Sequence, residues 1–284
     1  MHATPSGPGF CVVTPNFNMA GYLSETIESA LMNLGPNDRY FVVDGGSTDG
    51  SLDILRKYEG RISGWVSEPD SGYADAVSKG FDMVPSHYQC WIACGDVLLP
   101  GALHLARSIL EQTGAEMIYG DDFYIDENGK LLQVTNGDID NLAEMMLFGG
   151  WTPLQDACFW KTDLYTKVGG INPSIRYAAD YDLFLRMSML GRCIYTPHVF
   201  SAFRRHEGQT SERFRATYKA EKLAAANSVS AVMNKKPIPM WSKAYYWLYP
   251  KFRARISARN VKPIKGVNLG RLVHECQASF SSSY

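Results

Sequence analysis

The chain has 284 residues, of which 45% are hydrophobic and 20% charged, which is sufficient for one large packed domain. The net charge of −1 hides an asymmetry, because residues 1–221 carry 17 Lys and Arg against 28 Asp and Glu, whereas residues 222–284 carry 11 against 1. The first 24 residues lack Asp, Glu, Lys and Arg but contain three prolines, so we expect neither a signal peptide nor a membrane span there, and the six scattered cysteines argue against a disulfide or zinc framework.

Strands and helices are predicted to alternate through the first 112 residues. Short apolar runs predict strands at Phe10–Pro15, Tyr40–Val43, Gly64–Ser67 and Gln89–Cys94. Apolar residues at helical spacing predict helices at Ala20–Asn33, Leu52–Tyr58 and Tyr73–Met83, with another beginning at Pro100. Alternation of this kind predicts an α/β protein with a mostly parallel, doubly wound sheet.

The pattern changes in the second half of the chain. Glu116–Ile125 and Lys130–Thr135 flank a turn that contains Asn-Gly, and we expect them to pair as a hairpin. Further helices are predicted over residues 141–147, 178–190 and 213–233, and strand-like segments over 157–160 and 193–203.

The segment Tyr40–Ser51, which reads YFVVDGGSTDGS, predicts a strand, a tight turn and the start of a helix. The strand ends on Asp44, Gly45 and Gly46 permit the turn, and the Ser-Thr-Asp triplet supplies helix-capping side chains. A carboxylate would then lie at the carboxyl end of a strand beside a helix N-terminus, where open α/β sheets bind ligands and phosphate is stabilised. An ordinary strand–turn–helix junction is the alternative interpretation.

Five blocks of sequence together resemble the family 2 glycosyltransferases. They occur in order between residues 9 and 215 and read VVTPNFN, VVDGGSTDGS, SEPDSGYADAVSKGF, GD followed by LLPGAL, and AADYDLFLRM. The resemblance implies a GT-A type fold, with a Rossmann-like, mostly parallel central sheet flanked by helices and a C-terminal helical extension. It also implies transfer of a sugar from a nucleoside diphosphate donor with inversion at the anomeric carbon.

The resemblance implies roles for individual residues as well. The implied donor-binding residues are Thr14, Pro15, Asn18, Asp44, Gly45, Asp70, Asp75, Lys79, Gly95 and Asp96. Asp180 corresponds to the catalytic base, and Asp182 is its rival two residues along the same helix. Trp151 and Gln155 fall where an acceptor-binding loop is expected, although a core position for the tryptophan is an equal alternative.

The sequence departs from the family pattern where a divalent metal, Mn²⁺ or Mg²⁺, is expected. Family members present two neighbouring acids at the end of the fourth strand, whereas the segment Ala93–Asp96 contains one. We expect the metal to be held by Asp96 and the diphosphate, with His206 as a further ligand, or to be weakly bound or dispensable. Cys94 is a soft ligand and is expected to pack instead. The base motif has Ala179 where the family has Glu.

Other charged residues leave two interpretations open. Asp121 and Asp122 either add oxygen ligands for the metal or are exposed acids after a strand. Arg204 and Arg205 either pair with phosphate or form a solvated corner. Two rival functions also stay open: a non-catalytic nucleotide-sugar-binding homologue, which the missing acid favours, and a nucleotidyltransferase, which the absence of a Gly-rich triphosphate loop disfavours.

The segment from Lys235 to Arg271 carries ten basic and six aromatic residues and no acid. Such a segment suits peripheral binding to an anionic membrane, which would fit a lipid-linked or other saccharide acceptor. Packing onto the main domain is the alternative, and we expect no nucleic acid partner. We therefore divide the chain into a nucleotide-sugar-binding half (1–112), an acceptor-binding and catalytic half (113–221) and a basic extension (222–284), and expect a cytoplasmic protein, peripheral on the inner membrane face.

Overall fold

The computed structural model describes residues 9–139, 141–149, 151–206, 209 and 213–232. Its strands are β1 Phe10–Asn16, β2 Arg39–Asp44, β3 Gly64–Ser67, β4 Tyr88–Trp91, β5 Val97–Leu98, β6 Met117–Ile125, β7 Leu131–Val134, β8 Cys158–Lys161 and β9 Cys193–Arg204. Its helices are α1 Ala20–Leu31, α2 Ser51–Tyr58, α3 Tyr73–Asp82, α4 Ala102–Thr113, α5 Leu142–Gly149, α6 Thr162–Lys167, α7 Ala179–Leu190 and α9 Arg215–Val232, with a short 3₁₀ turn η1 at Gln155–Ala157. The predicted membrane-binding segment 235–271 lies outside the described residues.

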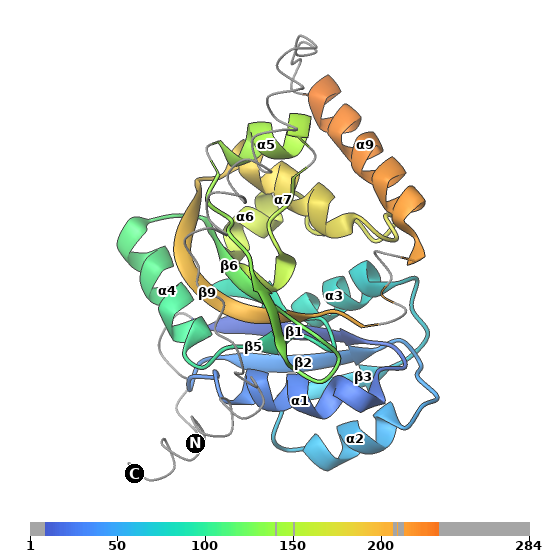
Figure 1. Ribbon diagram of the computed structural model, residues 1–284. Coiled ribbons are helices and arrows are strands. Elements are labelled where there is room, and N and C mark those ends of the chain that lie inside the picture. The colour runs from blue at the N-terminus through green and yellow to red at the C-terminus, as the bar shows by residue number, and fades with distance from the viewer. Residues whose placement is uncertain (1–8, 140, 150, 207–208, 210–212, 233–284) are drawn as a thin grey trace.

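A single mixed sheet organises the described part of the chain, in the order β3-β2-β1-β4-β8-β6-β9-β5, with β7 paired to β6 (Figure 1). The first four strands in that order are parallel to one another, and β6 is parallel to β9. β8 lies antiparallel between β4 and β6, and so joins the early strands to the later ones. The predicted α/β class with a mostly parallel sheet flanked by helices is confirmed.

Alternate side chains of the central strands build two hydrophobic cores, one on each face of the sheet. Phe10 and Val12 of β1 pack with α1, α2 and α4, whereas Cys11 and Val13 pack with α3, α5, α7 and α9. This is the period of two expected for a strand buried on both faces. Figure 1 shows α1 and α2 below the sheet and α5, α6 and α7 above it.

Several element boundaries differ from the sequence prediction. The fourth strand stops at Trp91 instead of Cys94, because the chain turns toward Gly95, whose φ is +110°. The hairpin is confirmed as β6 and β7, and the C-terminal helix as α9. The two-residue strand β5 and the short helix α6 were not predicted, since both are too short to carry a periodic pattern.

The predicted three-part division of the chain stays a prediction. α9 runs without a break across the boundary placed at residues 221 and 222, and β8 of the second part pairs with β4 of the first. Within the part of the chain that the structure describes, we find no helix both long enough and apolar enough to cross a membrane.

Candidate active site

Asp44 lies at the end of β2 and is completely buried, with 0% of its surface exposed. Its carboxylate accepts hydrogen bonds from Asn16 Nδ2 (2.6 Å), Ser47 Oγ (2.5 Å), Ser47 N (2.9 Å), Gly46 N (3.2 Å) and Ser67 Oγ (2.6 Å). Burial by itself raises the pKa of this carboxyl, but the donated hydrogen bonds outweigh it and hold the pKa below its usual range. Asp44 is therefore a fixed anion that joins the ends of β1, β2 and β3.

The same loops are cross-linked around Asn18. Its backbone N–H donates to Ser47 Oγ (2.7 Å), and its side-chain oxygen accepts from Thr48 N (2.9 Å). Asn18 has a φ of +52°, which asparagine tolerates better than most residues because its short polar side chain bonds locally. The neighbouring Phe17 is 62% exposed, so the residue before Asn18 presents an aromatic side chain to solvent.

Asp70 approaches the Asp44 loop closely. A Cβ placed on Gly45 would lie 2.8 Å from Asp70 Oδ2, so a larger residue at position 45 would force the Asp70 side chain to move. Burial, followed by the charges of Asp75 and Asp44, raises the pKa of Asp70 in spite of the hydrogen bond from Gly72 N. Two half-buried or buried carboxyls therefore face the same loop, where they repel a further negative charge and suit hydroxyl or amide donors.

The other predicted donor-binding residues differ in how far they are exposed. Lys79 forms ion pairs with Glu68 (2.9 Å) and Asp75 (3.4 Å) at the surface. Pro15 is half-buried, and Thr14 is buried in the core, where its hydroxyl accepts a hydrogen bond from Tyr40 (2.9 Å). Thr14 therefore supports these loops from within the core, and its predicted contact with the nucleotide stays a prediction.

Asp96 is turned inward. It is 5% exposed, and its Oδ1 accepts a hydrogen bond from Arg204 N (2.9 Å). The Arg204 guanidinium is 2% exposed and donates to the Gly95 carbonyl (2.8 Å) and to Glu25 (2.6 Å). Arg204 is therefore an internal cross-link, and the interpretation as a solvated corner is wrong, whereas its pairing with phosphate stays a prediction.

Asp96 belongs to a buried group of acids. Asp122 and Asp156 are both buried, and burial followed by the charge of Asp156 raises the pKa of Asp96 and of Asp122 well above the usual range. Burial also raises the pKa of Asp156, to about 6. Asp122 is thus not an exposed acid, and Asp121 is held by Gly137 N (2.7 Å) and Tyr195 (3.0 Å).

The expected metal does not fit the donor set. Across the described ranges, no three or more His, Cys, Asp or Glu side chains are grouped so that they could hold a metal ion. The ring of His206 lies 5.8 Å from that of Tyr22, and Arg205 lies 4.2 Å over Tyr124. The Cys94 thiol donates to the Met19 carbonyl (3.7 Å), which agrees with the expectation that Cys94 packs within the protein. The assignment of Asp96 and His206 as metal ligands stays a prediction without a supporting donor set.

Asp180 lies in the first turn of α7 and is reached by Tyr73, the first residue of α3. The Tyr73 hydroxyl accepts a hydrogen bond from Asp180 N (3.0 Å) and donates to Asp180 Oδ1 (3.3 Å). Burial raises the pKa of Asp180, although a hydrogen bond from the Tyr181 backbone, the charge of Lys222 and the Tyr73 hydroxyl act against it. Asp182 instead forms an ion pair with Arg186 (2.6 Å), so the rival carboxylate is already committed within the helix.

Two residues of α9 touch this part of α7 and were not predicted. The Glu221 carboxylate accepts hydrogen bonds from Tyr177 N (2.8 Å) and Ala178 N (2.9 Å), just before α7 begins. Lys222, the next residue, lies over the Tyr181 ring at 4.4 Å. No local motif marks these residues, since their roles depend on contacts across more than 40 positions. Phe17 and Tyr73, by contrast, lie inside conspicuous blocks.

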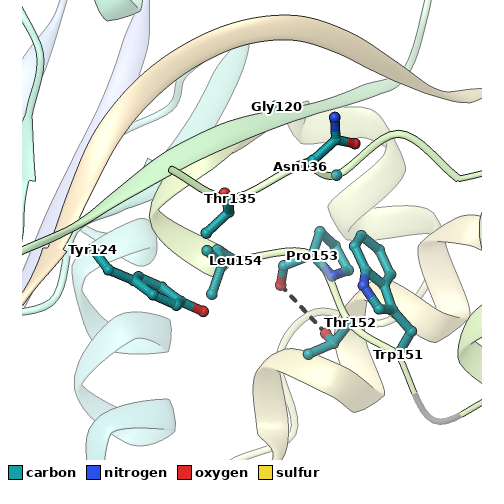
Figure 2. Close-up of a pocket in the computed structure, with 9 residues that line it drawn as sticks. Gly120, Tyr124, Thr135, Asn136, Trp151, Thr152, Pro153 and Leu154 are labelled. Carbon is teal, nitrogen blue, oxygen red and sulfur yellow. Dashed lines mark hydrogen bonds between the residues drawn. The ribbon is translucent and has the colours of Figure 1, made fainter. Parts of the chain in front are cut away.

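Trp151 lines a small cavity beside β6 (Figure 2). The cavity holds about 110 Å³ and is walled by Trp151, Thr152, Pro153 and Leu154 on one side and by Tyr124 and Thr135 on another. The Trp151 ring meets Tyr119 edge-on at 6.1 Å. Gln155 does not line this cavity, because it begins η1 and is half-buried. The predicted acceptor residues are thus neighbours in the chain that face different surroundings.

Solved structures with the same fold define the class of the protein. Staphylococcus aureus TarS (residues 1–349, in complex with UDP-GlcNAc) aligns with a TM-score of 0.63 at 14% identity, covering 84% of this chain and 70% of that one. A mannosyltransferase from Pyrobaculum calidifontis in complex with GDP-Man and Mn²⁺ aligns with a TM-score of 0.62 at 17% identity, covering 95% and 80%. The fold is therefore that of the GT-A glycosyltransferases.

Sequence comparison identifies the family. The model for glycosyl transferase family 2 matches residues 11–160, and the chain belongs to that family. An uncharacterized glycosyltransferase of Rickettsia typhi is 25% identical over 211 residues, which are 72% of this chain and 66% of the relative. The chondroitin synthase of Pasteurella multocida is 25% identical over 197 residues, or 65% of this chain but 19% of the synthase. The alignments thus span two thirds or less of these relatives.

Proposed function

We propose that this chain is an inverting glycosyltransferase that moves a sugar from a nucleoside diphosphate sugar to an acceptor hydroxyl. The contact between Tyr73 and Asp180 carries this proposal. Tyr73 follows the Asp70 loop by three residues, so the contact brings the segment expected to close over the nucleotide next to the expected base. Family membership and the UDP-GlcNAc and GDP-Man complexes of the structural neighbours support a nucleotide-sugar donor.

The loops after β1, β2 and β3 are the proposed donor site. The exposed Phe17 ring is suited to stacking on the nucleotide base, since every base presents an apolar face. Asp70 is the carboxyl that we assign to hydroxyl or amide groups of the nucleoside, because the oxygens of Asp44 already accept five hydrogen bonds within the protein. Asp75 and Lys79 would then border the cleft at its surface.

In the proposed reaction the acceptor oxygen attacks the anomeric carbon from the face opposite the diphosphate. A new carbon–oxygen bond forms while the bond from the anomeric carbon to the phosphate oxygen breaks, and the electron pair leaves with the nucleoside diphosphate. The acceptor proton passes to the Asp180 carboxylate, whose pKa is raised by burial and which is therefore a stronger base than an exposed aspartate. A single displacement of this kind inverts the anomeric configuration.

The acceptor is proposed to be a saccharide or a lipid-linked saccharide of surface polysaccharide or glycolipid assembly. Support comes from the aromatic wall that Trp151 gives to the cavity beside β6, since aromatic faces suit sugar rings, and from the similarity to a chondroitin synthase. A cytoplasmic location with peripheral membrane contact through residues 235–271 belongs to the same proposal. Removal of the segment after residue 234 should then shift the protein from the membrane to the soluble fraction, and unchanged partitioning would contradict it.

A screen of nucleotide sugars for binding and turnover tests the proposed function. Thermal shift with UDP-, GDP- and dTDP-sugars should identify one donor that raises the melting temperature, and the wild-type protein should then release the matching nucleoside diphosphate. A donor that binds without any release, with a range of saccharide acceptors present, would favour a non-catalytic homologue. That alternative has its own support, since the segment Ala93–Asp96 carries one acid where the family pattern implies two.

A further inference from the structure

α9 supplies a carboxylate to the backbone from which α7 starts. Glu221 Oε2 accepts from Tyr177 N (2.8 Å) and Ala178 N (2.9 Å), and Oε1 accepts from Arg176 N (3.3 Å). The N-cap residue of α7 is Ala178, which has no side-chain oxygen to offer. Glu221 therefore accepts from the N-cap N–H and from the two backbone N–H groups that precede it, and so holds the segment that leads into α7.

The next residue of α9, Lys222, lies over the ring of Tyr181, the residue that follows Asp180. Its ammonium lies 4.4 Å from the centre of the Tyr181 ring and 5.3 Å from that of Tyr218, and it interacts electrostatically with Asp180. Burial lowers the pKa of Lys222 to about 8, against the opposing pull of the Asp180 charge. Burial disfavours the charged form of both groups, and the charge of each favours the charged form of the other.

Four further titratable groups near Asp180 are neutral at pH 7, whereas the Glu221 carboxylate lies against the backbone of Ala178, two residues before it. They come from the helices and the strand packed against it and comprise Tyr73 of α3, Tyr181 of α7, Tyr218 of α9 and Cys158 of β8. Burial raises the pKa of each of these groups, so none of them supplies positive charge. Among the groups named here, Lys222 is the one that favours the ionised form of Asp180 by its charge.

We propose that Glu221 and Lys222 are positioning residues for the catalytic base: Glu221 fixes the backbone at which α7 begins, and Lys222 keeps the Asp180 carboxylate ionised and ready to accept the acceptor proton. This rests on the proposed function. It makes α9 part of the catalytic unit, although the sequence division placed Lys222 in an extension with no catalytic role. Removing the Lys222 charge takes away the positive charge that favours the Asp180 carboxylate, so a larger share of Asp180 is protonated at neutral pH.

The charge coupling is tested without any substrate. The Asp180 carboxyl carbon is followed by ¹³C NMR in protein labelled at aspartate carboxyls, with Asp180→Asn used to assign its resonance. We expect the titration midpoint to rise by about one pH unit in Lys222→Met, because loss of the opposite charge disfavours the ionised carboxylate. Lys222→Arg should stay near the wild type. Equal midpoints in wild type and Lys222→Met would overturn the proposal.

Matched controls separate this effect from damage to the fold. Lys219 is exposed on the same helix, so Lys219→Met should leave the midpoint unchanged. Lys222→Gln repeats the test with a polar side chain if Lys222→Met does not fold. Glu221→Gln should speed amide hydrogen exchange at residues 176–178 while Lys222→Met leaves it unchanged, and unaltered exchange in Glu221→Gln would overturn the role given to Glu221.

The catalytic consequence is read from the pH profile of nucleoside diphosphate release. In Lys222→Met the acid limb of kcat should move upward by the same amount as the NMR midpoint, with donor affinity unchanged. A midpoint that moves while the acid limb does not would overturn the positioning role, because Asp180 would then not be the base. If the wild type releases no nucleoside diphosphate at all, the proposed function fails, whereas the NMR result still reports the coupling.

Discussion

Two carboxylates, the buried Asp44 and the half-buried Asp180, have opposite pKa shifts because the regions around them differ. On the donor side, Asp44 accepts five hydrogen bonds, and its pKa lies below the usual range. On the base side, Asp180 accepts a long hydrogen bond from Tyr73, and burial raises its pKa. A carboxylate with saturated oxygens can hold loops in place, whereas one with spare acceptor capacity and a raised pKa can take up a proton.

Replacement of the base should give the largest effect. Asp180→Asn removes the proton acceptor while keeping the shape of the side chain, so we expect nucleoside diphosphate release to fall by about 10²–10⁴-fold with donor affinity unchanged. Asp182→Asn is the matched control two residues away. It breaks the ion pair with Arg186 and should leave the rate within a few-fold of wild type. A slow Asp182→Asn variant beside an active Asp180→Asn variant would assign the base to Asp182 instead.

Replacement of the fixed anion should affect stability more than turnover. Asp44→Asn leaves a buried site arranged for an anion with a neutral amide, and we expect a loss of about 2 kcal/mol in the free energy of unfolding at pH 7, measured by urea denaturation. Because the pKa of Asp44 is lowered in the folded state, its stabilisation is present above the unfolded pKa of about 4 and is lost as the pH falls through the folded pKa. The difference between variant and wild type should therefore shrink below about pH 4.

The exposed ring at the donor side should contribute to binding alone. Phe17→Ala removes the proposed stacking surface, so we expect the donor Kd to rise by roughly tenfold, at the lower end of the usual contribution of base stacking. Its melting temperature should stay the same, since the ring is mostly in solvent. Calorimetric titration measures the donor Kd and thermal denaturation measures the melting temperature. Phe17→Tyr is the control that retains stacking.

The surface ion pairs of Lys79 should give the smallest effect on stability. Lys79→Ala breaks exposed pairs with Glu68 and Asp75, and such pairs are worth less than about 1 kcal/mol. The free energy of unfolding should therefore change little. A several-fold loss of donor affinity in Lys79→Ala would show that Lys79 contributes to donor binding. Unchanged affinity would exclude Lys79 from the donor site.

The donor side could be predicted from the sequence because it is built from local signals. Asp44, Gly45 and Asn18 lie in short strand–turn segments whose residue types dictate the turns they form, and the mostly parallel sheet follows from alternating strands and helices. The inward orientation of Asp96 could not be predicted this way, since it depends on Arg204, a residue more than 100 positions away.

The base side could be predicted only in part. The position of Asp180 at a helix start is a local feature, and the sequence indicates it correctly. Its surroundings come from helices distant in sequence. Tyr73 hydrogen bonds to Asp180, Glu221 accepts from Ala178 N, and the Lys222 ammonium interacts electrostatically with Asp180. Electrostatic surroundings of this kind arise only when the chain has folded, so periodicity and composition carry no trace of them.

The anomeric configuration of the product tests the central claim most directly, namely that Asp180 activates the acceptor on the face opposite the leaving diphosphate. The measurement is ¹H NMR of the saccharide formed from the donor that the thermal shift screen identifies. We predict the configuration opposite to that of the donor. A product that retains the donor configuration would contradict a single displacement assisted by this base.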